Sequence, residues 1–341
     1  MNSFGRTFRI SIFGESHGES VGIVVDGCPA GMPLTTYDFL PDLERRKGGT
    51  QKGTTPRQEE DLPIFKSGLF NNTTTGAPIT ILFENKNIRS GDYEKQRDVP
   101  RPGHADFVAH KKFAGFEDYR GSGHFSGRLT VALVAAGVIG KKILARFASP
   151  HAEGIGVTSS ILEIGGETDL DKGLQKAIDA KDSIGGIIEC RATGLPIGLG
   201  EPFFDSAESL LSHIVFAIPA VRGIEFGTGF AAAKMFGSDH NDAIETMEGQ
   251  TRTNHAGGIV GGLTNGNELV FRIAIKPTSS TPKEQNTLNW ETGKVEIASV
   301  KGRHDLCIAL RVPAILEAVT AIVLVDLMML EQRVQRISKI N

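Results

Sequence analysis

The sequence predicts an α+β fold in a single domain that covers residues 1–341. Three observations support this prediction. Short segments rich in β-branched and aromatic residues occur in both halves of the chain, which is typical of strands. Longer apolar segments have the length of buried helices. No low-complexity linker separates the halves, and a composition with 40% hydrophobic and 23% charged residues is that of a globular protein with a large core.

The expected strands and helices are distributed along the whole chain. The strands lie at residues 8–13, 21–26, 63–66, 78–83, 155–165, 185–193 and 268–275. A short helix, capped by Thr36, contains Phe39 and Leu43. The longer helices lie at residues 128–147, 206–219 and 313–335. The 41 glycines show no Gly-X-Y period, so we expect many tight turns between these elements.

Charge, cysteine content and hydropathy argue against several classes of protein. A net charge of −3 disfavours a protein devoted to nucleic acid, which normally has a basic excess. Cys28, Cys190 and Cys307 are an odd number without metal-type spacing, so we expect reduced thiols, no metal site and a cytoplasmic protein. We expect no signal peptide, because the N-terminus has no apolar stretch long enough for one. The apolar run at 129–140 is shorter than the about 18 residues that cross a membrane. We therefore expect neither membrane nor nucleic acid as a partner.

Two polar segments of the first half contain candidate acid–base groups. The turn at 14–18 places His17 at the end of a strand, where an imidazole with a pKa of about 6.5 can exchange a proton at neutral pH. The side chains of this turn can equally satisfy its own backbone groups, and the spacing does not decide between the two roles. The segment 101–106 combines a guanidinium, His104 and Asp106. This suggests an acid–base or anion site, although Asp106 can also stabilise the turn.

Basic and glycine-rich segments provide candidate anion sites. The segment 45–57 contains cations interleaved with glycine and threonine, which can wrap an anion or form a solvated loop. Its cations are Arg45, Arg46, Lys47, Lys52 and Arg57. The glycine-rich segment 118–128 leads into a predicted helix, so we favour an anion at the helix N-terminus over a purely structural turn. Polar residues rather than a buried strand precede it, which argues against a dinucleotide-binding loop.

Three further segments of this kind occur late in the chain. Glycines at 254–262 permit close approach to a flat ligand, residues 276–280 offer a cation and several hydroxyls, and residues 301–305 combine two cations with an imidazole and a carboxylate. A single charged turn is usually solvated surface. Because so many such turns occur in one chain of negative net charge, we do not expect every one of them to be solvated surface.

Six motifs of this sequence resemble those of the chorismate synthase family in order and approximate spacing. They are FGESHG at 13–18, RPGHAD at 101–106, RGSG at 120–123, NHAGG at 254–258, KPTSS at 276–280 and KGRHD at 301–305. The resemblance implies a β-α-β sandwich, a homotetramer, and a lyase of the shikimate pathway for aromatic amino-acid biosynthesis. Such an enzyme removes phosphate from 5-enolpyruvylshikimate 3-phosphate by anti-1,4-elimination to give chorismate. It uses reduced FMN without net redox change.

The resemblance also implies roles for individual residues. His17 acts near the substrate phosphate, His104 protonates the reduced flavin, and Asp305 handles the proton at flavin N5. The substrate-binding cations are Arg46, Arg101 and Arg128. The cofactor-binding positions are His124, Phe125, Ser126, Pro219, Ala220, Gly261, Lys276, Pro277, Thr278, Ser279, Ser280 and Arg303. Arg46 and Lys52 lie where the family has basic residues associated with NADPH, and the sequence leaves open whether NADPH or an external reductant reduces the flavin.

The chain departs from the family pattern at several of these positions. Residues 124–126 read His-Phe-Ser where the family commonly has Arg-Ser-Ser, and Gly127, Pro219 and Lys52 replace alanine, asparagine and arginine. Two other functions remain open from the residues alone: a non-catalytic anion- or RNA-binding protein that uses the segment 45–57, and a flavin oxidoreductase with net hydride transfer. The basic segment has no aromatic residue to stack on bases, which disfavours the first. Only the ordered motifs disfavour the second.

Overall fold

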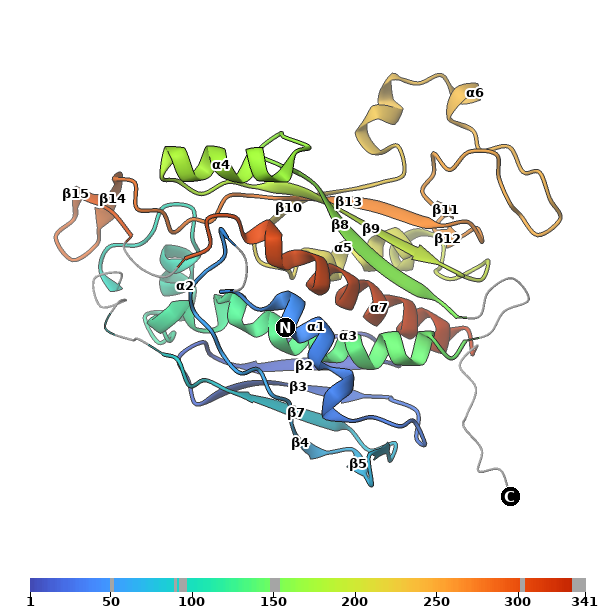
Figure 1. Ribbon diagram of the computed structural model, residues 1–341, viewed down its shortest axis with the longest axis horizontal. Coiled ribbons are helices and arrows are strands. Elements are labelled where there is room, and N and C mark those ends of the chain that lie inside the picture. The colour runs from blue at the N-terminus through green and yellow to red at the C-terminus, as the bar shows by residue number, and fades with distance from the viewer. Residues whose placement is uncertain (50–51, 89–90, 92–96, 148–153, 301–303, 333–341) are drawn as a thin grey trace.

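Two antiparallel sheets lie on either side of a pair of long helices (Figure 1). The computed structural model describes residues 1–49, 52–88, 91, 97–147, 154–300 and 304–332. The first sheet has the strand order β1-β2-β3-β7-β4. Its strands are β1 (Ser3–Phe4), β2 (Arg9–Gly14), β3 (Ser20–Asp26), β7 (Ile79–Glu84) and β4 (Ile64–Ser67). In β7 the alternate residues Ile79, Ile81 and Phe83 are buried, because one face of this sheet packs on the helices.

The second sheet has the strand order β10-β13-β9-β8. Its strands are β10 (Val221–Phe226), β13 (Leu269–Ile275), β9 (Gly186–Thr193) and β8 (Gly156–Ile164). Cys190 in β9 lies opposite Phe271 in β13, and both are fully buried. Three two-stranded hairpins lie outside the sheets: β5–β6 (Leu69–Phe70 and Thr73–Thr74), β11–β12 (Ile259–Val260 and Leu263–Thr264) and β14–β15 (Gln285–Asn289 and Lys294–Ala298).

The central helices are α3 (Thr130–Leu144) and α7 (Val312–Leu330). Both are apolar around nearly their whole circumference, which suits helices that are covered on all sides. Gly137 permits their close approach, since a Cβ there would lie 2.2 Å from the Cβ of Ala318. By length and composition Ile308–Leu330 is apolar enough to cross a membrane, but 78% of its most apolar window is buried inside the molecule. That is the arrangement of a core helix.

The other helices lie around this core. They are α1 (Leu40–Arg46), α2 (Asp106–Phe113), α4 (Leu170–Ala180), α5 (Ala207–Val215) and α6 (Gly237–His240), with 3-10 turns at Thr36–Asp38, Arg120–Phe125, Gly127–Leu129, Phe203–Asp205, Gly229–Lys234 and Ile308–Arg311. The segment that contains α6 extends beyond the second sheet (Figure 1).

Two buried carboxylates fasten α7 to distant parts of the chain. Asp326 accepts hydrogen bonds from the backbone N–H groups of Arg6, Thr7 and Phe8 at 2.7–3.1 Å. Glu317 pairs with Arg45 of α1 at 2.6 Å and with Lys141 of α3 at 2.7 Å. Because both carboxylates have several donors, their burial is compensated.

All seven predicted strands are present with small shifts at their ends, and α3, α5 and α7 confirm the longer predicted helices. Thr36 was the wrong cap for the short helix: Thr35 and Asp38 form a capping box one residue earlier, ahead of α1. The elements that were not predicted are α2, α4, α6, β1, β5–β6, β10, β11–β12 and β14–β15. The cysteines are free and buried, as expected.

Candidate active site

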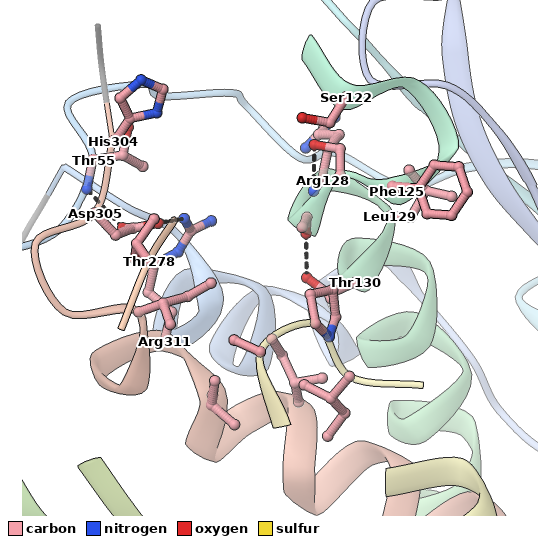
Figure 2. A pocket seen from close by; sticks show the side chains of 18 of the residues that line it. Thr55, Ser122, Phe125, Arg128, Leu129, Thr130, Thr278, His304, Asp305 and Arg311 are labelled. Carbon is pink, nitrogen blue, oxygen red and sulfur yellow. Dashed lines mark hydrogen bonds and ion pairs between the residues drawn. The ribbon is translucent and has the colours of Figure 1, made fainter. Parts of the chain in front are cut away.

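A cavity of about 520 Å³ lies at the N-terminal ends of α3 and α7. Segments that are far apart in the sequence converge on it: residues 46–48, 55–61, 101–105, 121–133, 217–222, 276–280 and 304–315. Figure 2 shows Asp305 and Arg311 on one side of this cavity and Ser122, Arg128 and Thr130 on the other. Five of the seven polar segments singled out in the sequence therefore meet in one place, whereas no residue of 14–18 or 254–262 lines the cavity.

Most of the predicted site residues line the cavity. They are Arg46, Arg101, His104, His124, Phe125, Ser126, Arg128, Pro219, Ala220, Lys276, Pro277, Thr278, Ser279, Ser280 and Asp305. Arg303 lies outside the described residues. His17, Lys52 and Gly261 do not line the cavity. Lys52 is exposed and its Nζ donates to Gln175 at 3.2 Å, whereas Gly261 lies in the tight turn of the β11–β12 hairpin.

Asp106 fixes the orientation of His104. Its Oδ1 lies 2.6 Å from His104 Nδ1 and accepts a hydrogen bond from Arg101 Nη2 at 2.7 Å. Because an ionised carboxylate only accepts, Nδ1 carries the proton and Nε2 is the ring atom left to exchange one. Burial raises the pKa of Asp106, but hydrogen bonds from Arg101 and His104 outweigh burial and hold that pKa well below its ordinary value. The carboxylate is therefore ionised at neutral pH.

Arg101 joins three of the six motifs. Besides Asp106, its guanidinium donates to Ser280 Oγ at 3.0 Å and to Ser122 Oγ at 2.8 Å. The RPGHAD, KPTSS and RGSG segments are thus connected through a single buried side chain. Most of the N–H donors of Arg101 are used in these contacts, so the main role of this arginine is to link the three segments by hydrogen bonds.

Asp305 lies on the opposite wall, where both oxygens of its carboxylate accept a hydrogen bond. Its Oδ1 accepts the backbone N–H of Thr55 at 2.8 Å, and its Oδ2 accepts Arg311 Nη1 at 2.9 Å (Figure 2). Arg311 Nε in turn donates to the carbonyl oxygen of Arg46 at 2.9 Å. Arg311 Nη2 makes no hydrogen bond to the residues that the structure describes, so it is available to a ligand anion.

Arg46 and Arg128 share one carboxylate, that of Asp61. Arg46 Nη1 donates to Asp61 Oδ2 at 2.9 Å, and Arg128 Nη1 pairs with Asp61 Oδ1. Burial raises the pKa of Asp61, but the two guanidinium groups outweigh burial and lower it. All three side chains are buried and line the cavity.

His17 lies behind the loop that lines the cavity and is only 5% exposed. Gly121 packs on its ring, since a Cβ there would lie 2.4 Å from His17 Cδ2. Gly121, Ser122 and Gly123 have φ values of 58°, 69° and 49°, a left-handed coil that favours glycine. The backbone N–H of Ser16 donates to the Gly123 carbonyl at 3.0 Å. The FGESHG and RGSG motifs therefore interlock, with Gly121 between His17 and the cavity.

The unusual tripeptide 124–126 is held mostly by protein contacts. His124 Nδ1 lies 2.8 Å from the Gly14 carbonyl oxygen, and Nε2 lies 3.2 Å from Asn2 Oδ1. Phe125 is 41% exposed, and its ring centroid lies 6.2 Å from that of Phe113. Ser126 Oγ accepts the backbone N–H of Arg128 and caps the turn that leads into α3. Both ring nitrogens of His124 thus have protein partners.

The KPTSS segment supplies one orphan hydroxyl and one cation. Thr278 Oγ1 is buried without a hydrogen-bond partner among the described residues, and its residue lines the cavity. Lys276 Nζ donates to the Gly103 carbonyl at 3.0 Å and to Ser279 Oγ at 2.7 Å. Burial and the nearby charge of Arg222 lower the pKa of Lys276. A buried hydroxyl without a partner, in a cavity that is also lined by cations, suits an anionic ligand.

Six charged cavity residues were not assigned to the site from the sequence: Lys47, Arg57, Glu59, Asp61, Arg222 and Arg311. Arg57 belonged to the basic segment but had no role of its own. Arg222 follows Pro219 and Ala220 closely, which was a usable signal. Asp61 and Arg311 stand outside every motif, and only the fold brings them to the cavity.

The cavity combines an apolar wall with cations and acid–base groups. The larger apolar side chains come from Ile12, Phe125, Leu129, Leu133, Ile218, Ile308, Val312 and Ile315. The cationic side chains come from Arg46, Lys47, Arg57, Arg101, Arg128, Arg222, Lys276 and Arg311. Its volume is that of an ordinary small-molecule site. Such a cavity can hold a flat ring on the apolar wall and neutralise phosphate or carboxylate groups.

Known proteins share the sequence and the fold. The family model described as chorismate synthase matches residues 8–329. Chorismate synthase of Chitinophaga pinensis is 68% identical over 339 residues, covering 99% of this chain and 100% of that protein. Chorismate synthase of Methanocaldococcus jannaschii is 40% identical over 366 residues, covering 96% of each chain. A crystal structure of chorismate synthase covers 96% of this chain and 93% of its own, with a TM-score of 0.72 at 23% identity, and supports the α+β fold.

The fold and the cavity define an α+β enzyme with a site for an anionic small molecule. The family match over nearly the whole chain and the close relative make the assignment specific. This chain belongs to the chorismate synthase family, and it is a lyase.

Proposed function

We propose that this enzyme removes phosphate from 5-enolpyruvylshikimate 3-phosphate by anti-1,4-elimination to form chorismate, a step of the shikimate pathway in aromatic amino-acid biosynthesis. The observation that carries the proposal is the cavity itself. It gathers cations for the three anionic groups of this substrate around a small number of acid–base groups, in a chain 68% identical to a chorismate synthase. Among the described residues, no group of three His, Cys, Asp or Glu is arranged to hold a metal ion.

The residues present fit a reduced FMN cofactor. The apolar wall suits a flavin ring. The hydroxyl of Thr278, which has no partner among the described residues, suits an oxyanion such as a phosphate in a cavity that Lys276 and Arg222 also line. The residues that would hold it are Lys276–Ser280, Pro219, Ala220 and Phe125. When bound, the reduced flavin would supply electron density for the elimination without net redox change.

The chain's own residues would handle the protons. His104, oriented by Asp106, holds a proton at Nε2 or releases it there. Asp305 is a carboxylate acceptor whose position is fixed by Thr55 and Arg311. His17 lies behind Gly121. We propose that it acts on the departing phosphate either indirectly, through its contact with the RGSG loop, or directly, after that loop moves aside.

Arginines would bind the anionic groups of the substrate. Arg46, Arg101 and Arg128 keep the role assigned to them from the sequence, although much of their donor capacity is used within the protein. Arg311 has more donors to offer. We propose it as a further substrate cation on the Asp305 side of the cavity.

Further proposals rest mainly on family membership. They are a homotetramer, a cytoplasmic location, and NADPH as a reductant that Arg46 and Lys52 help to bind. Neither nucleic acid nor membrane is proposed as a partner. Lys52 and Gly261 lie away from the cavity within one chain, so their roles need a ligand or a neighbouring subunit that reaches them.

An anaerobic assay with photoreduced FMN tests the function. We expect 5-enolpyruvylshikimate 3-phosphate to release phosphate and to give a conjugated cyclohexadiene that absorbs in the ultraviolet. Oxidised FMN should support no turnover. Turnover without flavin would contradict the proposal, and consumption of reductant in step with product would point to the flavin oxidoreductase instead.

A further inference from the structure

Asp61 is a buried carboxylate to which no motif gave a role. Its side chain is 1% exposed, and it stands between the basic segment and β4. Its φ of 54° is in the left-handed region, which is uncommon for a residue other than glycine. Such a conformation persists where surrounding interactions stabilise it, and it is often found at functional sites.

The contacts of Asp61 are divided between two arginines. Oδ2 accepts Arg46 Nη1 at 2.9 Å, and Oδ1 pairs with Arg128 Nη1. Both arginine side chains are 3% exposed, and both line the cavity. One rigid carboxylate therefore sets the separation of two cations at the site.

The rest of each guanidinium is also held. Arg46 Nε donates to Thr130 Oγ1 at 3.0 Å, and its Nη2 faces two backbone carbonyl oxygens at 3.4 Å. Arg128 Nε donates to Asn85 Oδ1 at 2.8 Å, and its Nη2 donates to the Glu84 carbonyl at 3.1 Å. An arginine has five N–H donors in a fixed plane. Each of these arginines keeps few donors for a ligand, and the direction of those donors depends on Asp61.

Charge gives Asp61 a second effect. The two buried guanidinium groups repel each other, and the attraction of each to the Asp61 carboxylate offsets this repulsion. Together the three groups carry one net positive charge. We propose that Asp61 is a positioning residue that holds Arg46 and Arg128 as one unit for binding a phosphate or carboxylate oxyanion. That the oxyanion belongs to the substrate rests on the proposed function.

Two substitutions separate geometry from charge. D61E keeps the charge but moves the carboxylate by one methylene, and D61N keeps the size but removes the charge. In the anaerobic assay we expect KM for 5-enolpyruvylshikimate 3-phosphate to rise about tenfold or more in both variants, with a smaller change in kcat. A merely structural residue would lower the amount of folded enzyme and leave KM unchanged.

Glu317 provides a matched control. It is also a buried carboxylate that bridges two cations, Arg45 and Lys141, but it does not line the cavity. E317Q should lower the melting temperature and leave KM at the wild-type value. If E317Q raises KM as much as D61E and D61N do, the effect belongs to lost stability and the proposal is overturned.

Inorganic phosphate gives a readout that does not need the reaction. Because a ligand stabilises the folded state it binds, phosphate should raise the melting temperature of the wild type and of E317Q, and this shift should be absent in D61E and D61N. Should the wild type show the phosphate shift but no turnover, the proposed function fails while the role of Asp61 stands. Equal phosphate shifts in all four proteins, or none in the wild type, would overturn the proposal. If D61N does not fold, D61E alone decides.

Discussion

At the scale of single residues, the site depends on hydrogen-bond partners that fix where a side chain carries its proton and how that side chain is oriented. His104 precedes α2 and Asp106 is its first residue, so the carboxylate turns back to His104 Nδ1 at the start of the helix. The ion pair with Arg101 keeps this carboxylate charged. The role of this pair was ambiguous in the sequence. The structure shows an oriented imidazole whose Nε2 makes no hydrogen bond to the residues that the structure describes.

The first prediction concerns His104. We expect H104A to lower kcat by about 10²–10⁴-fold, the range for loss of a proton-transfer group. His110 is the control: it stacks on Trp290 at 4.6 Å, pairs with Glu117 and does not line the cavity. H110A should cost stability and keep turnover. Equal losses of kcat in the two variants would show that His104 has no special role.

The second prediction concerns the pH dependence that Asp106 gives to stability. Its pKa is lowered in the folded state, so its contribution is complete above the unfolded value of about 3.9 and is lost as pH falls through the lower folded value. D106N should therefore be less stable than the wild type at pH 7 by a margin that shrinks below about pH 4. Urea unfolding at several pH values measures this margin, and a margin that stays constant down to pH 3 would contradict the ion-paired state.

At the scale of elements, the glycine-rich loop before α3 connects the cavity to His17. Its left-handed coil brings the Ser16 N–H to the Gly123 carbonyl and places Gly121 against the imidazole. The sequence suggested a set of backbone N–H groups at a helix N-terminus. The structure adds that the same loop packs on a predicted catalytic residue.

The third prediction compares two glycines of this loop. G121A should reduce turnover and stability, because a methyl group at φ 58° would lie 2.4 Å from the His17 ring. G127A is the matched control: no atom lies within 4 Å of its added Cβ, and the family commonly has alanine there. Kinetics and thermal unfolding of both variants test the difference. Full activity in G121A would mean that the packing on His17 is not needed.

Elements that the sequence did not reveal have different explanations. The helix α2 has no apolar face, since Phe107 and Val108 are both exposed, so its periodicity carried no signal. The helix α4 had such a signal: Asp169 caps it, and Leu170, Leu174 and Ile178 recur every four residues. Its omission was an error of interpretation. The hairpin β14–β15 is largely exposed and has no buried face that would help to predict it from the sequence.

At the scale of the whole molecule, the two sheets and their helices enclose a large apolar core, but large apolar side chains also remain exposed in several regions. In the segment that extends beyond the second sheet, Phe230, Phe236 and Met247 are 81%, 80% and 98% exposed. Large apolar side chains gathered on a surface are typical of protein contacts. They support the proposed association of several copies of the chain.

The fourth prediction is the mass in solution. A homotetramer should scatter light as four times the 36.6 kDa of one chain at micromolar concentration. Replacing Phe230 and Phe236 together by serine should shift the mass toward smaller species if this segment lies in a contact, because less apolar surface would then be buried. A mass of 36.6 kDa for the unaltered protein would contradict the tetramer.

The sequence by itself determined most strands of the two sheets, the core helices and the family. Those features depend on local apolar patterns and on motifs whose order survives without coordinates. Only the tertiary structure decided which charged groups share the cavity. Asp61 meets Arg128 from a distant segment, Arg311 reaches Asp305 from the turn before α7, and His17 lies behind Gly121 instead of on the cavity wall. Such contacts depend on how separate segments pack in space, and no spacing along the chain encodes that distance.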